Sequence, residues 1–375
     1  MLGSFVKEMI ATGLHRSGGL KIAGVISRSY ELNADHALRL RRNSGPRFVI
    51  LCYHRIGVGG IPFYSNLPTS RFEQQMRYLR RNCRLISLDQ LLQEMGQPGS
   101  SETAVAVTFD DGYLGTYTDA FPILRKYEIP ATVYLTAGCI ETGEVAWYDR
   151  IFLALQAMIK KSCEVRIPHY RRFELDSYES RLSAAVELIR YLRTLPNDRR
   201  LEECASLEKI VRLPQGELKN RMMNWDQIRQ MQRAGIRFEA HTMTHPVLSR
   251  LDAVSLNAEL AESKRLIEER IQSEVKHFAY PFGKSEECGE ATGAALLRLG
   301  FRSAVTTISG VNTPMVHPYR LRRVQMGDDV SLSMFAFRLA RLMLQPDLGE
   351  GYLDPLVTHN MTLREEEQSR EAKHA

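Results

Sequence analysis

Short apolar runs alternate with longer amphipathic stretches along this chain. The run at 105–109 is continuous and rich in β-branched residues, which predicts a strand buried on both faces, as in a parallel sheet. Helical patterns separate the runs, and this alternation predicts parallel βαβ units in either an open sheet or a barrel. The expected core strands are 48–53, 104–109, 131–135, 236–239, 277–280 and 301–306.

Two of the expected helices carry end signals. Ser70 and Glu73 match a capping box, in which the two side chains satisfy free amide groups at the start of a helix that continues past Met76. A second helix is expected over 225–234 and stops at Gly235, which is a good C-terminal cap.

Residues 146–223 break the alternation of strands and helices. They are rich in Arg, Glu and Leu, with helical periodicity at 151–159 and 182–192, and they predict a helical insertion between two core units. An amphipathic helix is expected at 335–344, and a charged, disordered tail from Arg364 onward. We therefore expect a basic N-terminal segment, a core domain that contains the insertion, and a C-terminal helix with its tail, over 1–46, 47–330 and 331–375.

Composition adds few constraints. The 375 residues are 44% hydrophobic and 25% charged, which is typical of a soluble globular protein. The formal net charge of +6 permits an anionic partner or membrane surface without demanding one. The six cysteines are scattered without a CxxC pair, which indicates free thiols and a reducing compartment.

The N-terminus shows no signal peptide, because Lys7 and Glu8 interrupt its first apolar stretch. No apolar run approaches the length of a membrane span. The segment 5–28 mixes apolar and basic residues, which predicts either an interfacial helix on an anionic membrane or a helix packed across the domain. We expect a cytoplasmic protein, or one peripheral to the inner membrane face.

The first candidate site is the sequence TFDDG at 108–112. Asp110 and Asp111 follow an expected buried strand, at the edge where α/β folds place their sites. Adjacent carboxylates repel each other, and a metal ion that binds one would leave the other free as a base. A turn is the alternative, since Asp-Gly is a common turn signal.

The second candidate is the sequence HTMTH at 241–245, directly after another expected strand. Two imidazoles four residues apart fall on one face of a helical turn and can reach a single ion. Two histidines and one carboxylate supply three ligands and leave a fourth position for water, which is the arrangement of a catalytic zinc site.

TFDDG and HTMTH, in this order, closely resemble the first two motifs of the polysaccharide deacetylase family (the NodB-homology, carbohydrate esterase 4 group). The sequence YPFG at 280–283 is similar to the third motif, usually written RPPYG. The resemblance covers 47–324 apart from the insertion. It implies that the 47–330 domain is a deformed (β/α) barrel with deacetylase chemistry.

The resemblance also implies roles for individual residues. A divalent metal, usually zinc, would be bound by Asp111, His241 and His245, and Asp110 would be the general base that takes a proton from the bound water. The metal and a backbone amide near Phe282 would stabilise the oxyanion. Pro281 and Phe282 of the third motif would line the substrate and oxyanion side of the site, together with Arg320. Tyr280 is expected there too, with packing in the sheet as the alternative.

Two features depart from the family pattern. The general acid normally lies in a late Leu-x-x-His motif, and here that form occurs early, at 51–54, as in family members that resemble a circular permutation. We therefore expect His54 to be the acid, with a core histidine as the alternative. Ala279 stands where the third motif has an arginine that orients the base, and Arg320 and Arg322 are candidate replacements. A fourth motif with Asp and Trp is not evident.

The expected activity is metal-dependent hydrolysis of an N-acyl group, in particular N-acetyl, from an amino sugar. The substrate would be a polysaccharide or a lipid-linked saccharide of surface-polysaccharide synthesis, with peripheral membrane contact and no nucleic-acid partner. Two alternatives stay open. One is an O-deacylase or deformylase that uses the same machinery on a sugar intermediate, and the other is a catalytically weak carbohydrate-binding protein.

Overall fold

A computed structural model of the chain describes residues 47–57, 66–97, 103–158, 161–166, 170–211, 221–327 and 331–344. The expected interfacial segment at 5–28 and the charged tail from Arg364 lie outside these residues. Among the helices in the described ranges, none combines the length and the apolar character that a membrane span requires. All six cysteines are free, as predicted.

The core is an eight-stranded sheet in the order β10-β1-β3-β4-β7-β8-β9, with β2 paired to β3. Every strand pair in it is parallel. The first three predicted strands have the predicted bounds, and the later three differ from the prediction by one or two residues at an end. The strands are β1 (Phe48–Tyr53), β2 (Arg84–Leu85), β3 (Ala104–Phe109), β4 (Ala131–Leu135), β7 (Arg237–Ala240), β8 (His277–Ala279), β9 (Ser303–Val305) and β10 (Val324–Gln325).

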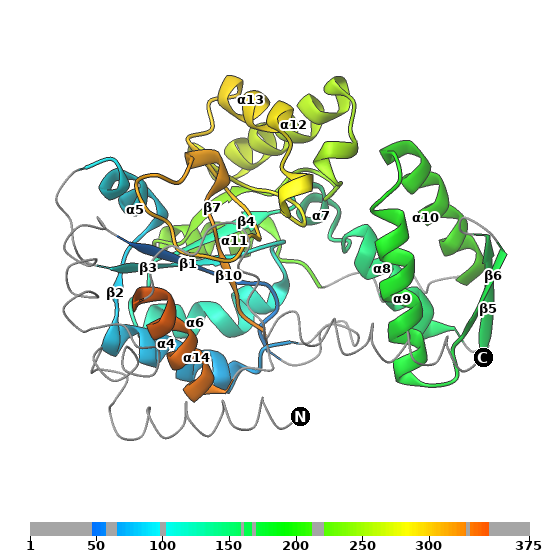
Figure 1. Cartoon of the computed structure of the whole chain (residues 1–375), viewed down its shortest axis with the longest axis horizontal. Helices are drawn as coiled ribbons and strands as arrows, with labels where there is room; N and C mark the ends of the chain where they lie inside the picture. The colour runs from blue at the N-terminus through cyan, green and yellow to red at the C-terminus, as the bar shows by residue number, and fades with distance from the viewer. Residues whose placement is uncertain are drawn as a thin grey trace, which may run out of the picture.

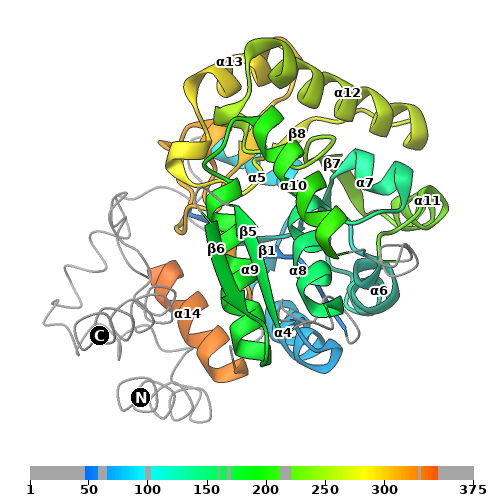
Figure 2. The same cartoon turned by 90° about the vertical axis from the view of Figure 1, so that its right-hand side faces the viewer.

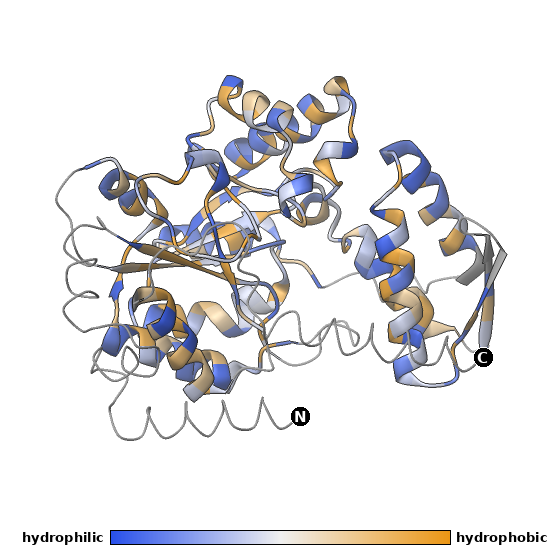
Figure 3. Cartoon of the chain, in the orientation of Figure 1, coloured by the Kyte–Doolittle hydropathy of each residue, from blue (hydrophilic) through white to orange (hydrophobic). Residues whose placement is uncertain are grey.

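The two edges of the sheet approach each other. A bridge between Val305 and Leu321 joins β9 to the segment that leads into β10, and β10 pairs with β1. The sheet is therefore curled into a half-barrel, which confirms the predicted deformed (β/α) barrel. Every residue of β1 and β3 is buried, and Figure 3 shows these apolar strands in the left half of the view, between the helices above and below them.

Helices cover the outside of the sheet, with α12 and α13 on one side and α4, α6 and α14 on the other (Figure 1). Short helical turns lie at η2 (Thr116–Ala120), η4 (Leu248–Arg250), η5 (Ser285–Glu287) and η6 (Pro318–Arg320). The outer helices are α4 (Thr69–Asn82), α5 (Leu88–Met95), α6 (Phe121–Lys126), α7 (Ala137–Thr142), α11 (Trp225–Arg233), α12 (Ala253–Ile271), α13 (Glu290–Arg298) and α14 (Leu332–Leu344).

The predicted capping box at Ser70 is wrong. The cap position of helix α4 is Pro68, two residues before Ser70, so the helix begins at Thr69 and has no side-chain cap bond. The Thr69 hydroxyl instead donates to Asp119 at 2.6 Å, so a tertiary contact fixes the start of the helix. The predicted end of the other helix is confirmed, because α11 stops before Gly235, which has a φ of 95°.

The segment predicted as a helical insertion contains α8 (Trp147–Ala157), α9 (Tyr178–Leu192) and α10 (Asn197–Val211). It also contains an unpredicted antiparallel hairpin of β5 (Ser162–Arg166) and β6 (Tyr170–Glu174). We call the described residues of 147–211 the inserted unit. Figure 2 looks onto this unit, which lies in front of the strands between α12 and α4.

Candidate active site

Asp110 and Asp111 follow β3 at the carboxyl edge of the sheet. Asp111 has a φ of 70° and Gly112 a φ of 88°, so the chain turns through left-handed conformations directly after the strand. The turn gives the two buried carboxylates different neighbours. Asp110 pairs with Arg323, while Asp111 faces two imidazoles.

His241 and His245 follow β7 and approach Asp111. Nε2 of His241 lies 3.6 Å from Oδ1 of Asp111, and Nε2 of His245 lies 3.5 Å from the same oxygen. One ligand atom from each of the three residues lies within 4.8 Å of the others, and all three residues are buried. The fold therefore brings the three predicted metal ligands together.

The segment from His241 to His245 is a loop, so the predicted helical turn is wrong. Thr242 and His245 have φ values of 67° and 57°, which a right-handed helix excludes. Oγ1 of Thr242 accepts a hydrogen bond from the His245 amide at 3.0 Å. Glu259 on α12 accepts from loop amides, including that of Met243 at 2.8 Å. The two imidazoles meet because this loop is held in shape, not because of helical spacing.

A hydrogen bond orients His241, and burial governs the pKa of His245. Nδ1 of His241 lies 2.7 Å from the carbonyl oxygen of Ala279 and must donate to it, which leaves Nε2 with a free lone pair toward Asp111. Burial, reinforced by the neighbouring His241, lowers the pKa of His245 to about 3. Two imidazoles whose Nε2 atoms face one buried carboxylate are suitable metal ligands.

A divalent cation fits this cluster. Oδ1 of Asp111 is a buried oxygen without a hydrogen-bond partner among the described residues, and Nε2 of both histidines faces it. An ionised carboxylate in a buried position needs a compensating charge. Two imidazoles and one carboxylate are a donor set that zinc and related transition metals accept.

Asp110 is engaged in a different way. Both its oxygens accept hydrogen bonds from Arg323, from Nη1 and Nη2 at 2.6 Å each, and the Arg323 side chain is fully buried. Burial by itself would raise the pKa of Asp110, but the Arg323 guanidinium outweighs it and holds the pKa well below its usual range. Asp110 is therefore a fixed, ionised carboxylate.

The residue that orients Asp110 is Arg323, so the expectation of Arg320 or Arg322 is wrong. Arg323 directly precedes β10, which pairs with β1, and its side chain enters the barrel next to β3. Arg320 ends the turn η6 and is only half-buried. The three arginines lie within four positions, and only the register of β10 decides which one points inward.

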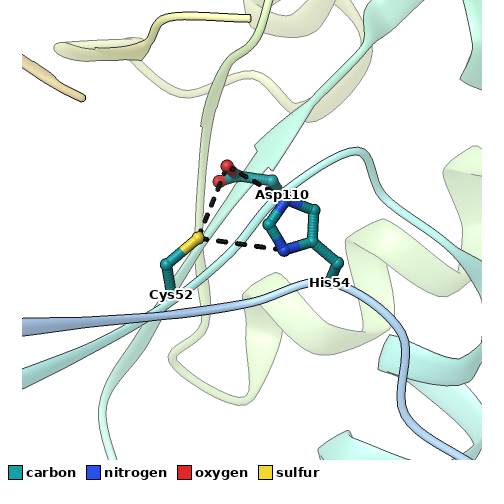
Figure 4. Close-up of side chains that lie close together, drawn as sticks. All are labelled: Cys52, His54 and Asp110. Carbon is teal, nitrogen blue, oxygen red and sulfur yellow. Dashed lines mark hydrogen bonds and ion pairs between the residues drawn. The ribbon is translucent and has the colours of Figure 1, made fainter. Parts of the chain in front are cut away.

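His54 also lies beside Asp110 (Figure 4). Its Nε2 is 3.8 Å from Oδ2 of Asp110, and its side chain is 40% exposed, so it stands at the open side of the site. The Cys52 thiol donates to the same oxygen at 3.6 Å, and its Sγ is 3.9 Å from Nδ1 of His54. Burial raises the pKa of Cys52, which keeps it a neutral donor.

Cys52, His54 and Asp110 form a second cluster of potential ligands, but a cation does not fit there. Both oxygens of Asp110 already accept from the buried Arg323 cation. His54 turns Nδ1 to Cys52 and Nε2 to Asp110, so neither ring nitrogen faces the other two residues together. Of the two clusters that the described residues form, only the one at Asp111 suits a metal.

The third-motif residues separate into two groups. Phe282, with a φ of 60°, packs its ring 4.8 Å from the ring of His245, and Pro281 precedes it in a buried position. Tyr280 does not face the site. It is 1% exposed, and its hydroxyl donates to the Tyr319 carbonyl, so the expectation that it lines the substrate is wrong.

Three site neighbours from the inserted unit were missed. Trp147 donates from Nε1 to the His245 carbonyl at 3.0 Å, and the Tyr148 ring lies 4.8 Å from the His245 ring. Asp149 forms a buried ion pair with Arg55, which follows the predicted acid in sequence. The sequence did offer one signal for these neighbours. A Trp-Tyr-Asp sequence stands at a helix start, in a chain that has only two tryptophans. A tryptophan and an aspartate, the residue types of the fourth motif that was not evident in the sequence, thus adjoin the site.

Comparisons with known proteins agree with this arrangement. The family model for polysaccharide deacetylases matches residues 97–172 and 198–304. The Bacillus subtilis protein YxkH, whose name assigns it provisionally to the polysaccharide deacetylases, is 24% identical over 80% of this chain and 79% of its own length. A poly-beta-1,6-N-acetyl-D-glucosamine N-deacetylase of Staphylococcus aureus is 29% identical over 27% of this chain and 39% of its own length.

Two solved structures share the fold. The Streptococcus pyogenes deacetylase PplD, in complex with acetate, is 18% identical, with a TM-score of 0.55, over 81% of this chain and all of that chain (100%). IcaB from Ammonifex degensii is 20% identical, with a TM-score of 0.50, over 81% of this chain and 98% of that chain.

Proposed function

Because this chain belongs to the polysaccharide deacetylase family, we propose that it is a metal-dependent hydrolase that removes an N-acyl group, in the first instance N-acetyl, from an amino sugar. The observation that carries this proposal is the division between two adjacent carboxylates. Asp111 converges with His241 and His245, while Asp110 is held apart by Arg323.

In this proposal Asp111, His241 and His245 hold a divalent cation, with zinc as the first candidate. Such an ion supplies a Lewis acid for the scissile carbonyl and lowers the pKa of a coordinated water. The chain contributes two imidazoles and a carboxylate whose ligand atoms converge. The fixed tautomer of His241 supports this assignment.

Asp110 is the proposed general base. It accepts a proton from the attacking water, and before that transfer Arg323 keeps it ionised and oriented, so no rearrangement precedes the step. A backbone amide near Phe282 would donate to the oxyanion, supported by the position of this residue against His245.

His54 is the proposed general acid. The amine released from an amide is a poor leaving group until its nitrogen gains a proton, and His54 is the half-exposed histidine beside the base. As the C–N bond breaks, His54 gives its proton to the nitrogen. Asp110, 3.8 Å away, can then return the proton it accepted, which restores both groups.

The proposed substrate is an N-acetylated glycan, either a polymer or a lipid-linked saccharide. The Staphylococcus aureus relative is named for poly-β-1,6-N-acetylglucosamine, which makes oligomers of that sugar the first compounds to assay. The similarity to that relative covers only part of each protein, so other N-acetylated glycans belong in the same panel.

The experiment that tests the function measures acetate and free amine together. Zinc-loaded and cobalt-loaded protein would be incubated with N-acetylated and O-acetylated glycans. We expect acetate and free amine in equal amounts from at least one N-acetylated glycan. Acetate without amine would identify an O-deacylase, and glycan binding without acetate would identify a binding protein; either result would contradict the proposal.

A further inference from the structure

The inserted unit contacts the candidate site from outside the barrel. Helix α8 supplies Trp147 and Tyr148, which lie against His245. Arg200 on α10 is 2% exposed and lies over the Trp147 ring, with its Cζ 4.8 Å from the ring centroid. Two helices of the unit therefore converge on the aromatic side of the metal loop.

A second arginine of the unit reaches the loop that carries the third motif. Arg193 caps the C-terminal end of α9, where its amide donates to the Ile189 carbonyl at 3.0 Å. Its Cζ lies 4.2 Å from the centroid of the Phe282 ring, and its guanidinium forms an ion pair with Glu287. The Arg193 side chain is 24% exposed and that of Glu287 is 8% exposed, so water screens the pair only partly.

Phe282 and Glu287 are the two ends of one loop, 282–287. Glu287 also accepts a hydrogen bond from the Lys284 amide at 3.0 Å, which closes the loop on itself. Phe282 adopts a φ of 60°, a conformation that an L-residue keeps only when its surroundings hold it there. Arg193 holds both ends, since its planar group covers the ring at one end and pairs with the carboxylate at the other.

We propose that Arg193 is a positioning residue for the hydrolysis, through which the inserted unit fixes the loop that presents the oxyanion amide. This inference rests on the proposed function of the site. The contacts are those of a partly exposed side chain, so their contribution to global stability is small. Their effect on the rate is larger, because a donor displaced by about 1 Å can cost up to about a hundredfold in turnover.

Three variants test the proposal. Arg193→Ala removes both contacts. Arg193→Lys keeps a charge near Glu287 but loses the planar face over Phe282. Arg190→Ala is the matched control, because Arg190 lies on the same helix and is exposed. The measurements are kcat and KM on the glycan that the wild type deacetylates, metal content, melting temperature, and hydrogen–deuterium exchange of peptides covering 282–287.

For Arg193→Ala we expect kcat to fall by at least about tenfold, with KM and metal content unchanged and faster exchange in 282–287. Arg193→Lys should recover part of kcat, and Arg190→Ala should match the wild type. If Arg193→Ala does not fold, a reduced kcat in folded Arg193→Lys supports the proposal.

Wild-type kcat in folded Arg193→Ala or, if that variant does not fold, in Arg193→Lys would overturn this inference while leaving the proposed function intact. Faster exchange with unchanged kcat would do the same, since the loop contact would then not serve catalysis. A wild-type protein that deacetylates no glycan would instead overturn the proposed function itself.

Discussion

At the scale of single residues, Arg323 makes two neighbouring carboxylates different. It engages both oxygens of Asp110 and none of Asp111 among the contacts of the described residues. Six non-glycine residues in the described part of the chain have positive φ, and four of them adjoin this region, namely Asp111, Thr242, His245 and Phe282. Strained conformations of this kind persist where the surrounding structure fixes them, and they cluster at functional sites.

Replacing Arg323 should be costly to stability. Arg323→Ala leaves the buried Asp110 carboxylate without its guanidinium, and we expect the free energy of unfolding in urea to fall by about 3–5 kcal/mol. Arg320→Ala, at the half-buried position first considered for this role, should cost less than about 1 kcal/mol. Equal losses of unfolding free energy in the two variants would show that Arg323 is not the residue that stabilises the Asp110 carboxylate.

His54 is tested by the choice of leaving group. With an amide substrate, His54→Ala should lower kcat by at least about a hundredfold, because the departing amine needs a proton. With an aryl ester, whose leaving group departs without protonation, the loss should be much smaller. Steady-state rates on the two substrates give the comparison. Similar losses on both would assign His54 a structural role, and a slight loss on the amide would exclude it as the acid.

At the scale of elements, buried strands were the most predictable feature. β1, β3 and β4 are buried throughout, so their continuous apolar runs predicted both ends of each strand correctly. The start of α4 was misplaced, because the contact of Thr69 with Asp119 joins residues far apart in sequence. The HTMTH loop was misread as a helical turn for a similar reason, since Glu259 on α12 helps to hold it.

The metal loop should therefore depend on Glu259. This carboxylate accepts hydrogen bonds from the Met243 amide at 2.8 Å and from the Thr244 amide at 3.0 Å. We expect Glu259→Ala to weaken zinc affinity by about 10–100-fold, as measured by competition with a chelator. Glu262→Ala, an exposed residue on the same helix, is the control. Unchanged affinity in Glu259→Ala would mean that the loop holds its shape unaided.

At the scale of the whole molecule, the site exists because distant segments meet at one edge of a curled sheet. The sequence could supply Asp110, Asp111, His241 and His245, since each follows a recognisable strand. It could not supply Arg323, which is 213 positions from Asp110 and reaches it only through the pairing of β10 with β1. Trp147 was missed for a similar reason, because its segment was predicted to be an insertion separate from the core that carries the site.

Metal binding should stabilise the folded protein as a whole, because the ligands converge only in the native state. At a free zinc concentration 100 times Kd, the expected gain is about 2.7 kcal/mol. Thermal melting with zinc and with a chelator measures it. His241→Ala should show no zinc-dependent shift, and a shift as large as that of the wild type would place the metal elsewhere.

The most direct test of the central claim measures metal content and deacetylation on the same samples of wild type, Asp110→Asn and His241→Ala. We predict that Asp110→Asn keeps its metal and loses turnover by about 10²–10⁴-fold, while His241→Ala loses metal and turnover together. Asp110→Asn with wild-type turnover, or a metal-free wild type with full turnover, would contradict the division of roles between Asp110 and Asp111.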